Sequence, residues 1–152
     1  MQVAKIIEFC FAHRASIEKA IREKRMDPAV PKTGGAAGNA QRSDPTCQKA
    51  LRNIAEISCV EIPYGASVNG RQDVFTLRRP ERWLRVVDLT FEHYRGKLEA
   101  NLITAKYVQC KSREEVCAEL CIGKSLYHVM QNDIFCFATG AAAGLGLVVP
   151  RR

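Results

Sequence analysis

Residues Ser112 to Met130 read SREEVCAELCIGKSLYHVM, and no other stretch of the chain has so specific a pattern. Ser112 and Glu115 have the spacing of a capping box, in which each side chain accepts a hydrogen bond from the backbone N–H of the other residue. A short helix should therefore begin just after Ser112. Residues 121–123 predict a turn, and a second helix should follow it. Two helices joined by so tight a turn predict a helix-turn-helix at about residues 112–136.

The second helix of such a motif can lie in the major groove of DNA, which is about 12 Å wide. Its inward side should carry Tyr127, Met130 and Ile134. The opposite side is polar and supplies the candidate base-reading residues Lys124, Ser125, His128, Gln131 and Asn132. Double-stranded DNA is therefore the partner that the motif predicts.

Two cysteines stand where a helix-turn-helix usually has smaller residues. Cys117 takes the place of the alanine at which the two helices approach, and Cys121 takes the place of the glycine in the turn. Residues 112–152 contain four basic and four acidic residues, so this part of the chain has no net charge with which to attract DNA. An ordinary helical hairpin is the alternative interpretation.

The composition is that of a globular, basic chain. Its 152 residues and 17.0 kDa leave room for one ordinary domain, and 47% hydrophobic residues are enough to form a core. Lys and Arg number 23 against 16 acidic residues, and the net charge of +7 favours a polyanionic partner. We expect Arg78, Arg82 and Arg85 to share one helix face. The candidate phosphate-contacting residues are Arg78, Arg79, Arg82, Arg85 and Arg113.

Upstream of the motif the pattern predicts helices. An apolar stripe predicts an N-terminal amphipathic helical arm at residues 1–25, and residues 26–46, rich in Gly and Pro, predict a flexible linker. Residues 47–149 are then expected to form the helical DNA-binding domain. No segment has a strand period that competes with the helical pattern. The expected fold is all-α, a helical arm plus a compact helical domain that ends in the helix-turn-helix.

Proline and glycine place the elements within that domain. A helix is expected at about residues 45–62 and a loop at 63–70, followed by an extended segment at 74–77. Arg79-Pro80 should open a long helix whose bulky inward face includes Trp83. The helical pattern should be interrupted at Gly96 and continue over residues 98–108.

A run of small residues, Gly140-Ala-Ala-Ala-Gly144, predicts a close helix–helix approach. Packing against the helix that contains Trp83 is the favoured use, and dimerisation is the alternative. The apolar stripe of the N-terminal helix also needs a partner. Both features make a homo-oligomer an open expectation.

Several other classes of site and location are not expected. Seven cysteines without an apolar leader indicate reduced thiols and a cytoplasmic protein. Cys110, Cys117, Cys121 and His128 lack the C-x-x-C spacing of a zinc site, so we expect no metal. Common catalytic and phosphate-loop motifs are missing, so we expect no enzyme and no cofactor. We expect no membrane span, because the longest uncharged stretch, 134–149, contains several glycines.

Short motifs spread over residues 43–148 resemble a known family. They are Ser43-Asp-Pro-Thr46, Arg79-Pro-Glu-Arg-Trp83, Tyr107, Ile122-Gly-Lys-Ser-Leu-Tyr-His128 and Gly144-Leu-Gly-Leu147. The chain is similar in these to the small phage and prophage transcriptional regulators of the ArpU/RinA kind, with a helix-turn-helix like that of region 4 of sigma factors. Gly123 stands where such proteins often have a serine that caps the second helix.

The resemblance implies a sequence-specific regulator of late or packaging genes, with contact to RNA polymerase. Two alternatives use the same motif differently. One is a DNA-packaging adaptor like the terminase small subunit, which would act within a ring. The other is a helix-turn-helix that serves only as a protein-interaction module.

Overall fold

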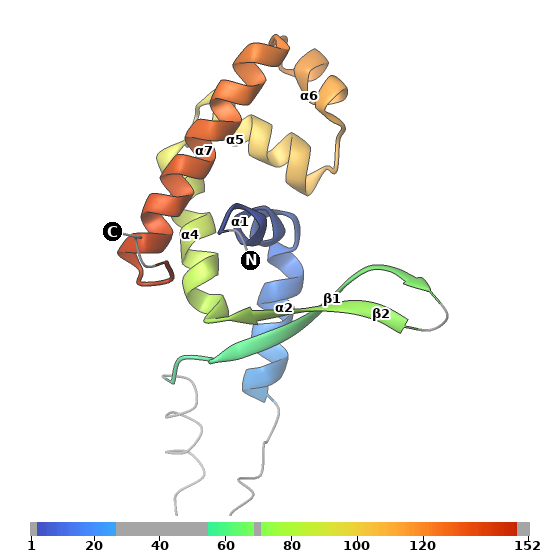
Figure 1. Cartoon of the computed structure of the whole chain (residues 1–152), viewed down its shortest axis with the longest axis vertical. Coiled ribbons are helices and arrows are strands. Elements are labelled where there is room, and N and C mark those ends of the chain that lie inside the picture. The colour runs from blue at the N-terminus through green and yellow to red at the C-terminus, as the bar shows by residue number, and fades with distance from the viewer. Residues whose placement is uncertain (1–2, 27–54, 69–70, 149–152) are drawn as a thin grey trace, which may run out of the picture.

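The computed structural model of the chain describes residues 3–26, 55–68 and 71–148 (Figure 1). Most of the expected linker and the first part of the helix expected at 45–62 lie outside these residues, as does the Ser43–Thr46 motif. The elements in chain order are α1 (Val3–Ala12), α2 (Arg14–Met26), β1 (Cys59–Val68), β2 (Arg71–Arg78), α4 (Pro80–His93), α5 (Leu98–Ile103), the π-helical turn η1 (Thr104–Val108), α6 (Arg113–Glu119) and α7 (Lys124–Gly144).

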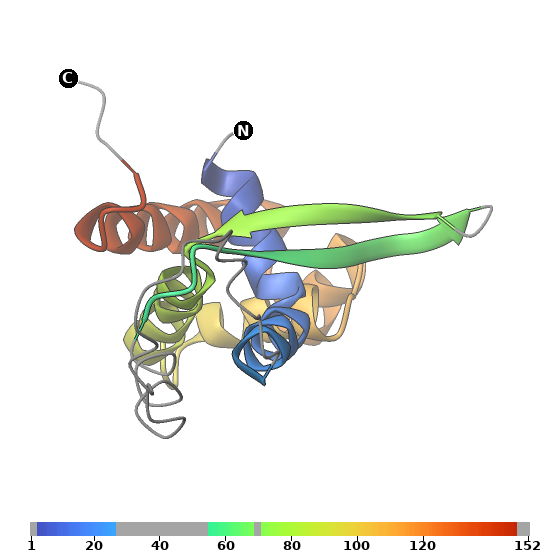
Figure 2. The same ribbon diagram turned by 90° about the horizontal axis from the view of Figure 1, so that it is seen from below.

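The all-α prediction is wrong, because β1 and β2 form an antiparallel hairpin. Residues Cys59 to Ile62, expected in a helix, pair as a strand with Arg78 to Phe75. The side chains alternate as a half-buried strand requires, since Val60 and Ile62 are buried while Glu61 between them is exposed. The hairpin extends well beyond the helices to one side (Figure 2).

The N-terminal segment forms two helices rather than one. His13 separates α1 from α2, and the two helices run in clearly different directions (Figure 1). α1 contributes Ile7, Cys10 and Phe11 to the buried core, and α2 contributes Ile17. The residues expected to form a separate arm therefore share one core with the downstream elements.

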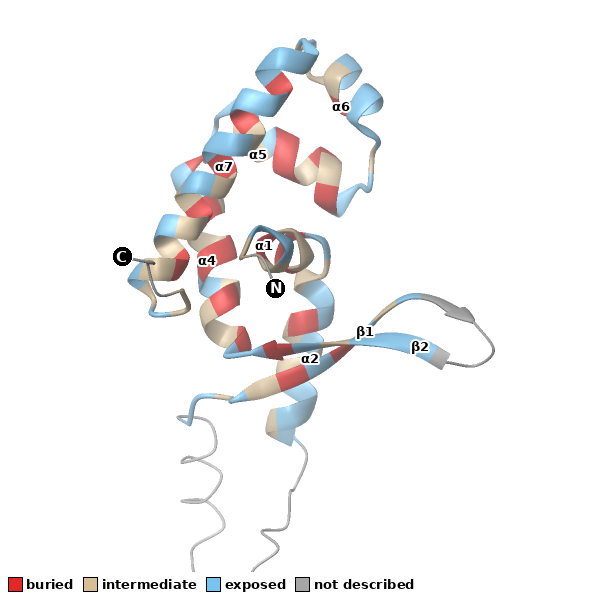
Figure 3. Ribbon diagram, viewed as in Figure 1, coloured by how far each residue is buried: buried red, intermediate tan, exposed pale blue. Residues whose placement is uncertain are grey.

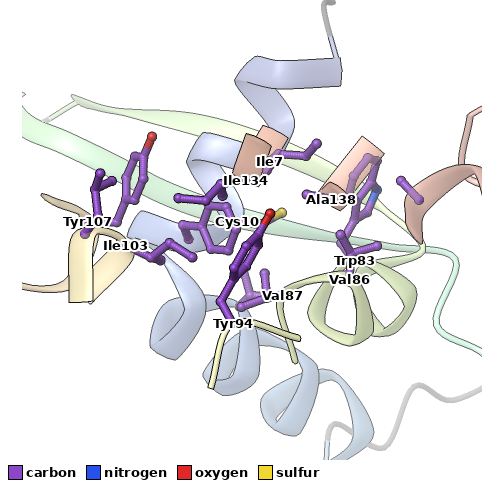
Figure 4. Close-up of a cluster of buried hydrophobic side chains, with 14 of the residues drawn as sticks. Ile7, Cys10, Trp83, Val86, Val87, Tyr94, Ile103, Tyr107, Ile134 and Ala138 are labelled. Carbon is purple, nitrogen blue, oxygen red and sulfur yellow. The ribbon is translucent and has the colours of Figure 1, made fainter. Parts of the chain in front are cut away.

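α1 packs near the centre of the molecule, against α4, α7 and η1 (Figure 1). The close-up of the core shows Ile7 and Cys10 among side chains from α4, α7 and η1 (Figure 4). An aromatic cluster ties the hairpin to α1, and in it Phe9 stacks on Phe75 with ring centroids 4.0 Å apart. This packing fixes the base of the hairpin.

The helical predictions downstream of the hairpin are confirmed. Pro80 is the first residue of α4, and Gly96, with a φ of 77°, interrupts the pattern before α5. The helical continuation over residues 98–108 is confirmed too, although its second half is the π-helical turn η1. Trp83, Val87 and Tyr94 face the core.

α7 packs along α4, as the small residues near its end predict. The buried small residues are Ala138 and Ala142, while Gly140 and Gly144 are exposed. A Cβ added at either glycine would meet no atom within 4 Å. The close approach therefore uses the alanines on one side of α7, and the glycines lie on its open side.

Candidate nucleic-acid interface

The first helix of the motif begins at the predicted capping box. Ser112 Oγ accepts a hydrogen bond from Glu115 N at 3.4 Å, and Glu115 Oε2 accepts one from Ser112 N at 2.7 Å. The bond from the Ser112 backbone lowers the pKa of Glu115. The side chain of Val116 is buried, which anchors α6 to the body of the molecule.

The turn after α6 is a left-handed C-cap of the Schellman type. Cys121 has a φ of 53°, the conformation that glycine usually supplies at this position. The N–H of Ile122 donates to Cys117 O at 3.0 Å, and the N–H of Cys121 donates to Ala118 O at 3.3 Å. The turn predicted at residues 121–123 is therefore confirmed, with a cysteine in the strained position.

α7 begins at Lys124 without a side-chain cap. Gly123 is its N-cap residue, with extended backbone, and offers no side chain to the free N–H groups of the first turn. Tyr127, Met130 and Ile134 are buried as predicted. One side of α7 is thus fixed against the core along its whole length, as the alternation of buried and exposed colours in Figure 3 shows.

Four of the five candidate base-reading residues lie exposed on the first turns of α7. They are Lys124, Ser125, His128 and Asn132. Gln131 differs, because it is half-buried and its side chain hydrogen-bonds Tyr107. Burial raises the pKa of Tyr107, and the bond from Gln131 partly opposes that shift. The structure therefore assigns Gln131 a contact between η1 and α7.

Two exposed apolar residues lie on the same helix and are not among the candidates predicted from the sequence. Leu126 is 47% exposed and Val129 is 55% exposed. Val129 lies four residues after Ser125 and three before Asn132, which puts it on the same side of the helix. The sequence alone shows this spacing, so Val129 could have been predicted to lie on the exposed side. The exposed side of α7 is thus a mixed surface, polar with an apolar strip.

The arginines expected to hold phosphates lie apart from this surface, with the exception of Arg113. Arg78 is the last residue of β2, so the expectation that it shares a helix face with Arg82 and Arg85 is wrong. Arg82 donates to Leu145 O at 3.0 Å, just after the end of α7. Because α7 has 21 residues, Lys124 lies about 30 Å away along the helix.

Most of these arginines make intramolecular contacts. Arg79 Nη1 donates to Gly146 O at 3.2 Å, and Arg82 Nη2 pairs with Glu56 at 2.9 Å. Arg85 Nη1 lies 3.6 Å from Glu92 Oε1. Arg113, at the start of α6, pairs with Glu114 at 2.9 Å, and this pairing lowers the pKa of the glutamate.

The cysteines and His128 form no metal cluster in the described part of the chain. No group of three potential ligands among His, Cys, Asp and Glu is close enough there to hold an ion. Cys110 and Cys121 are exposed free thiols. None of the helices within residues 3–26 and 71–148 has the length and apolar character that a membrane crossing requires.

Comparison of the chain with known protein families, with curated proteins and with solved structures finds no match.

Proposed function

We propose that the chain is a sequence-specific DNA-binding protein that inserts the first turns of α7 into the major groove of double-stranded DNA. The observation that carries this proposal is the geometry around Cys121. A capped α6 ends in a left-handed turn of fixed shape, and α7 starts immediately after it with polar, exposed side chains. α6 and the beginning of α7 lie together at one end of the molecule (Figure 1).

The exposed side chains have the chemistry of base readout. Lys124 can donate to the acceptors of guanine, and Asn132 can bond adenine through the oxygen and the NH2 of its side-chain amide. Val129 offers an apolar contact for the methyl group of thymine. Ser125 and His128 add groups that either donate or accept a hydrogen bond. The surface thus supports a mixed recognition sequence.

Charge near the motif adds little nonspecific attraction. Between residues 106 and 133 the basic side chains are Lys106, Lys111, Arg113 and Lys124, and the acidic ones are Glu114, Glu115, Glu119 and Asp133. Four positive charges against four negative ones leave a sum of zero. The affinity should therefore depend weakly on salt, because few counterions are released when few phosphates are neutralised.

The biological setting is proposed from the family resemblance. In it the protein is a cytoplasmic regulator of late or packaging genes of a phage or prophage, with RNA polymerase as a second partner. It acts by binding rather than catalysis and uses no cofactor. A homo-oligomer would allow two copies of α7 to bind neighbouring half-sites.

A protein-interaction role is the second candidate, and specific residues favour it. Leu126 and Val129 expose apolar side chains on α7, and Val108 is 63% exposed at the end of η1. An apolar surface with balanced charge is also suited to a protein partner. The same face of α7 would then dock on that partner.

Fluorescence anisotropy with DNA fragments from the surrounding genome tests the proposal. We expect one fragment to bind at least about 10³-fold more tightly than random duplex. Asn132→Ala should lower this preference by about tenfold or more, because a bidentate base contact is lost. Lys19→Ala on α2 is the control for Lys124→Ala, since both remove one exposed positive charge and Lys19 lies outside the motif.

Three results would contradict the proposal. An equal effect of Lys19→Ala and Lys124→Ala would show that net charge, not α7, governs binding. Uniform and steeply salt-dependent binding by a ring-sized oligomer would indicate a packaging adaptor. No binding at low salt would assign the exposed side of α7 to a protein partner.

A further inference from the structure

A cleft lies at the opposite end of α7 from the proposed DNA-binding surface. It has a volume of about 490 Å³, within the range of small-molecule sites. α1, the base of the hairpin, the start of α4 and the turn after α7 all line it. Its apolar walls include Ile6, Phe75 and Leu147, and its polar side has Arg78 and Arg79.

The cleft is positively charged. Among the described residues that line it there is no aspartate or glutamate. Within the described residues, the guanidinium of Arg78 makes no hydrogen bond or ion pair, and that of Arg79 donates to a backbone carbonyl. Their neighbours on α4 differ, since Arg82 pairs with Glu56 and Arg85 with Glu92. Two cations that have no carboxylate partner in the described part of the chain therefore border one cleft.

The end of β2 and the residue before α4 bring the two arginines to the cleft. The consecutive residues Phe75 to Arg79 all line it, so the end of the strand forms part of its wall. Arg79 has a φ of 50°, a left-handed conformation that is unfavourable for a residue with a side chain. Residues held in such conformations cluster at functional sites, ligand-binding sites among them.

Trp83 is also among the residues that line the cleft. Trp83 is only 5% exposed, and its indole N–H donates no hydrogen bond within the described residues. A largely buried indole N–H usually has an acceptor. Figure 4 shows Trp83 on α4 beside Ala138 of α7.

We propose that this cleft binds a small organic anion, a carboxylate or phosphate attached to a compact apolar or aromatic body. The anionic group would be bound by Arg78 and Arg79, whose planar guanidinium groups match both anions. Its body would lie against Phe75, Ile6 and Leu147. The indole N–H of Trp83 would donate to an oxygen of the ligand. This site is independent of the proposed DNA binding.

Intrinsic fluorescence gives a direct test, because Trp83 is the only tryptophan of the chain. The full-length protein, without DNA, is titrated with phenyl phosphate and with phenylacetate. We expect a saturable change in the fluorescence of Trp83 for at least one of them. The compound that binds more tightly identifies the class of anion. Inorganic phosphate has the charge without the body and benzyl alcohol has the body without the charge, so both should bind at least about tenfold more weakly.

Arg78→Gln and Arg85→Gln form a matched pair of variants. Each removes one exposed arginine charge, but only Arg78 lines the cleft. Arg78→Gln should weaken binding of the better probe about tenfold, the effect of losing one charge-assisted hydrogen bond, and Arg85→Gln should leave it unchanged. No saturable response to either aromatic anion would overturn the proposal. Equal affinities of the two variants, or an inorganic-phosphate response as strong as that of the aromatic anions, would also overturn it.

Discussion

Gly123 leaves the first turn of α7 without a side-chain cap, although its backbone suits one. Its φ of −76° and ψ of 159° are accessible to any residue, and an added Cβ meets nothing within 4 Å. Gly123→Ser should therefore raise the free energy of unfolding by about 1 kcal/mol, through a new hydrogen bond and a less flexible unfolded chain. Urea denaturation measures the change.

Gly123→Ala separates the two contributions at this position. Alanine restricts the unfolded chain but cannot cap the helix. The serine variant should therefore be the more stable of the two. If Gly123→Ala raises the free energy of unfolding as much as Gly123→Ser does, the serine side chain does not cap the first turn of α7.

Cys10 makes the stability of the protein dependent on pH under alkaline conditions. Burial raises the pKa of its thiol from 9.0 to about 12. Below pH 9 the thiol is neutral in both states. Above pH 9 it ionises first in the unfolded chain, so the stability should fall by about 1.4 kcal/mol per pH unit until about pH 12.

Cys10→Ala isolates this effect, because Tyr94 and Tyr107, whose pKa values are also raised, titrate in both proteins. The measurement is urea denaturation of both proteins at several pH values. The difference in unfolding free energy, wild type minus variant, should be constant up to pH 9 and then decrease. A constant difference up to about pH 11 would mean that the thiol ionises as readily in the folded state.

At the scale of single elements, α7 should tolerate substitutions on one side and not on the other. Gly140 is exposed about one turn before the end of α7, so Gly140→Ala should stabilise the protein by up to about 1 kcal/mol. Ala142 is fully buried, and Ala142→Leu should destabilise it by about 1–3 kcal/mol through overpacking. Thermal or urea unfolding of both variants checks the contrast.

Gly140→Leu tests the dimer alternative at the same place. The exposed side of α7 has room for a leucine side chain at this position, so the variant should fold. Its molar mass, measured by light scattering, should equal that of the wild type. A lower molar mass than that of the wild type would instead place Gly140 in an interface between copies.

The elements that sequence reasoning predicted are those whose signals are local. The capping box of Ser112 and Glu115, Pro80 at the start of α4 and the break at Gly96 each act within a few residues. The hairpin was not predicted, because only two alternating apolar positions of β1, Val60 and Ile62, point inward. This strand signal is weaker than the helical pattern of the residues that precede it. An Asn69-Gly70 pair, a typical hairpin signal between alternating segments, was available.

The same distinction applies to the candidate interface. The exposed face of α7 follows from the helical period, and four of the five predicted residues lie on it. The partner of Gln131 could not be predicted in this way, because Tyr107 lies on another element. Similarly, Arg79 and Arg82 bond carbonyl oxygens more than 60 residues away in the sequence. Such contacts depend on tertiary packing and leave no local signal.

At the scale of the whole molecule, α7 joins two distant surfaces. Its first turns form the proposed DNA-binding face, and the residues that follow its last turn line the charged cleft. The chain's excess positive charge is therefore not evidence for a single binding surface. The arginines of α4 lie at the cleft end, about 30 Å along α7 from Lys124.

This separation predicts how arginine and lysine substitutions will affect DNA binding. Arg85→Gln should leave both the affinity for DNA and its salt dependence unchanged, because only the first turns of α7 enter the groove. Lys124→Gln should weaken binding to the specific fragment and reduce the slope of log affinity against log salt by up to about 1. Anisotropy titrations at several salt concentrations measure both quantities.

The opposite result would revise the geometry of the complex. If Arg85→Gln reduces the salt slope as much as Lys124→Gln does, the DNA must run along the length of α7 and reach α4. Arg85 would then contact a phosphate, as the sequence predicts, and DNA that reaches as far as Arg78 and Arg79 should compete with the aromatic anions for the cleft. The salt slopes of the two variants on one DNA fragment therefore distinguish two complexes. In one, only the first turns of α7 contact the DNA, and in the other the DNA lies along the length of α7.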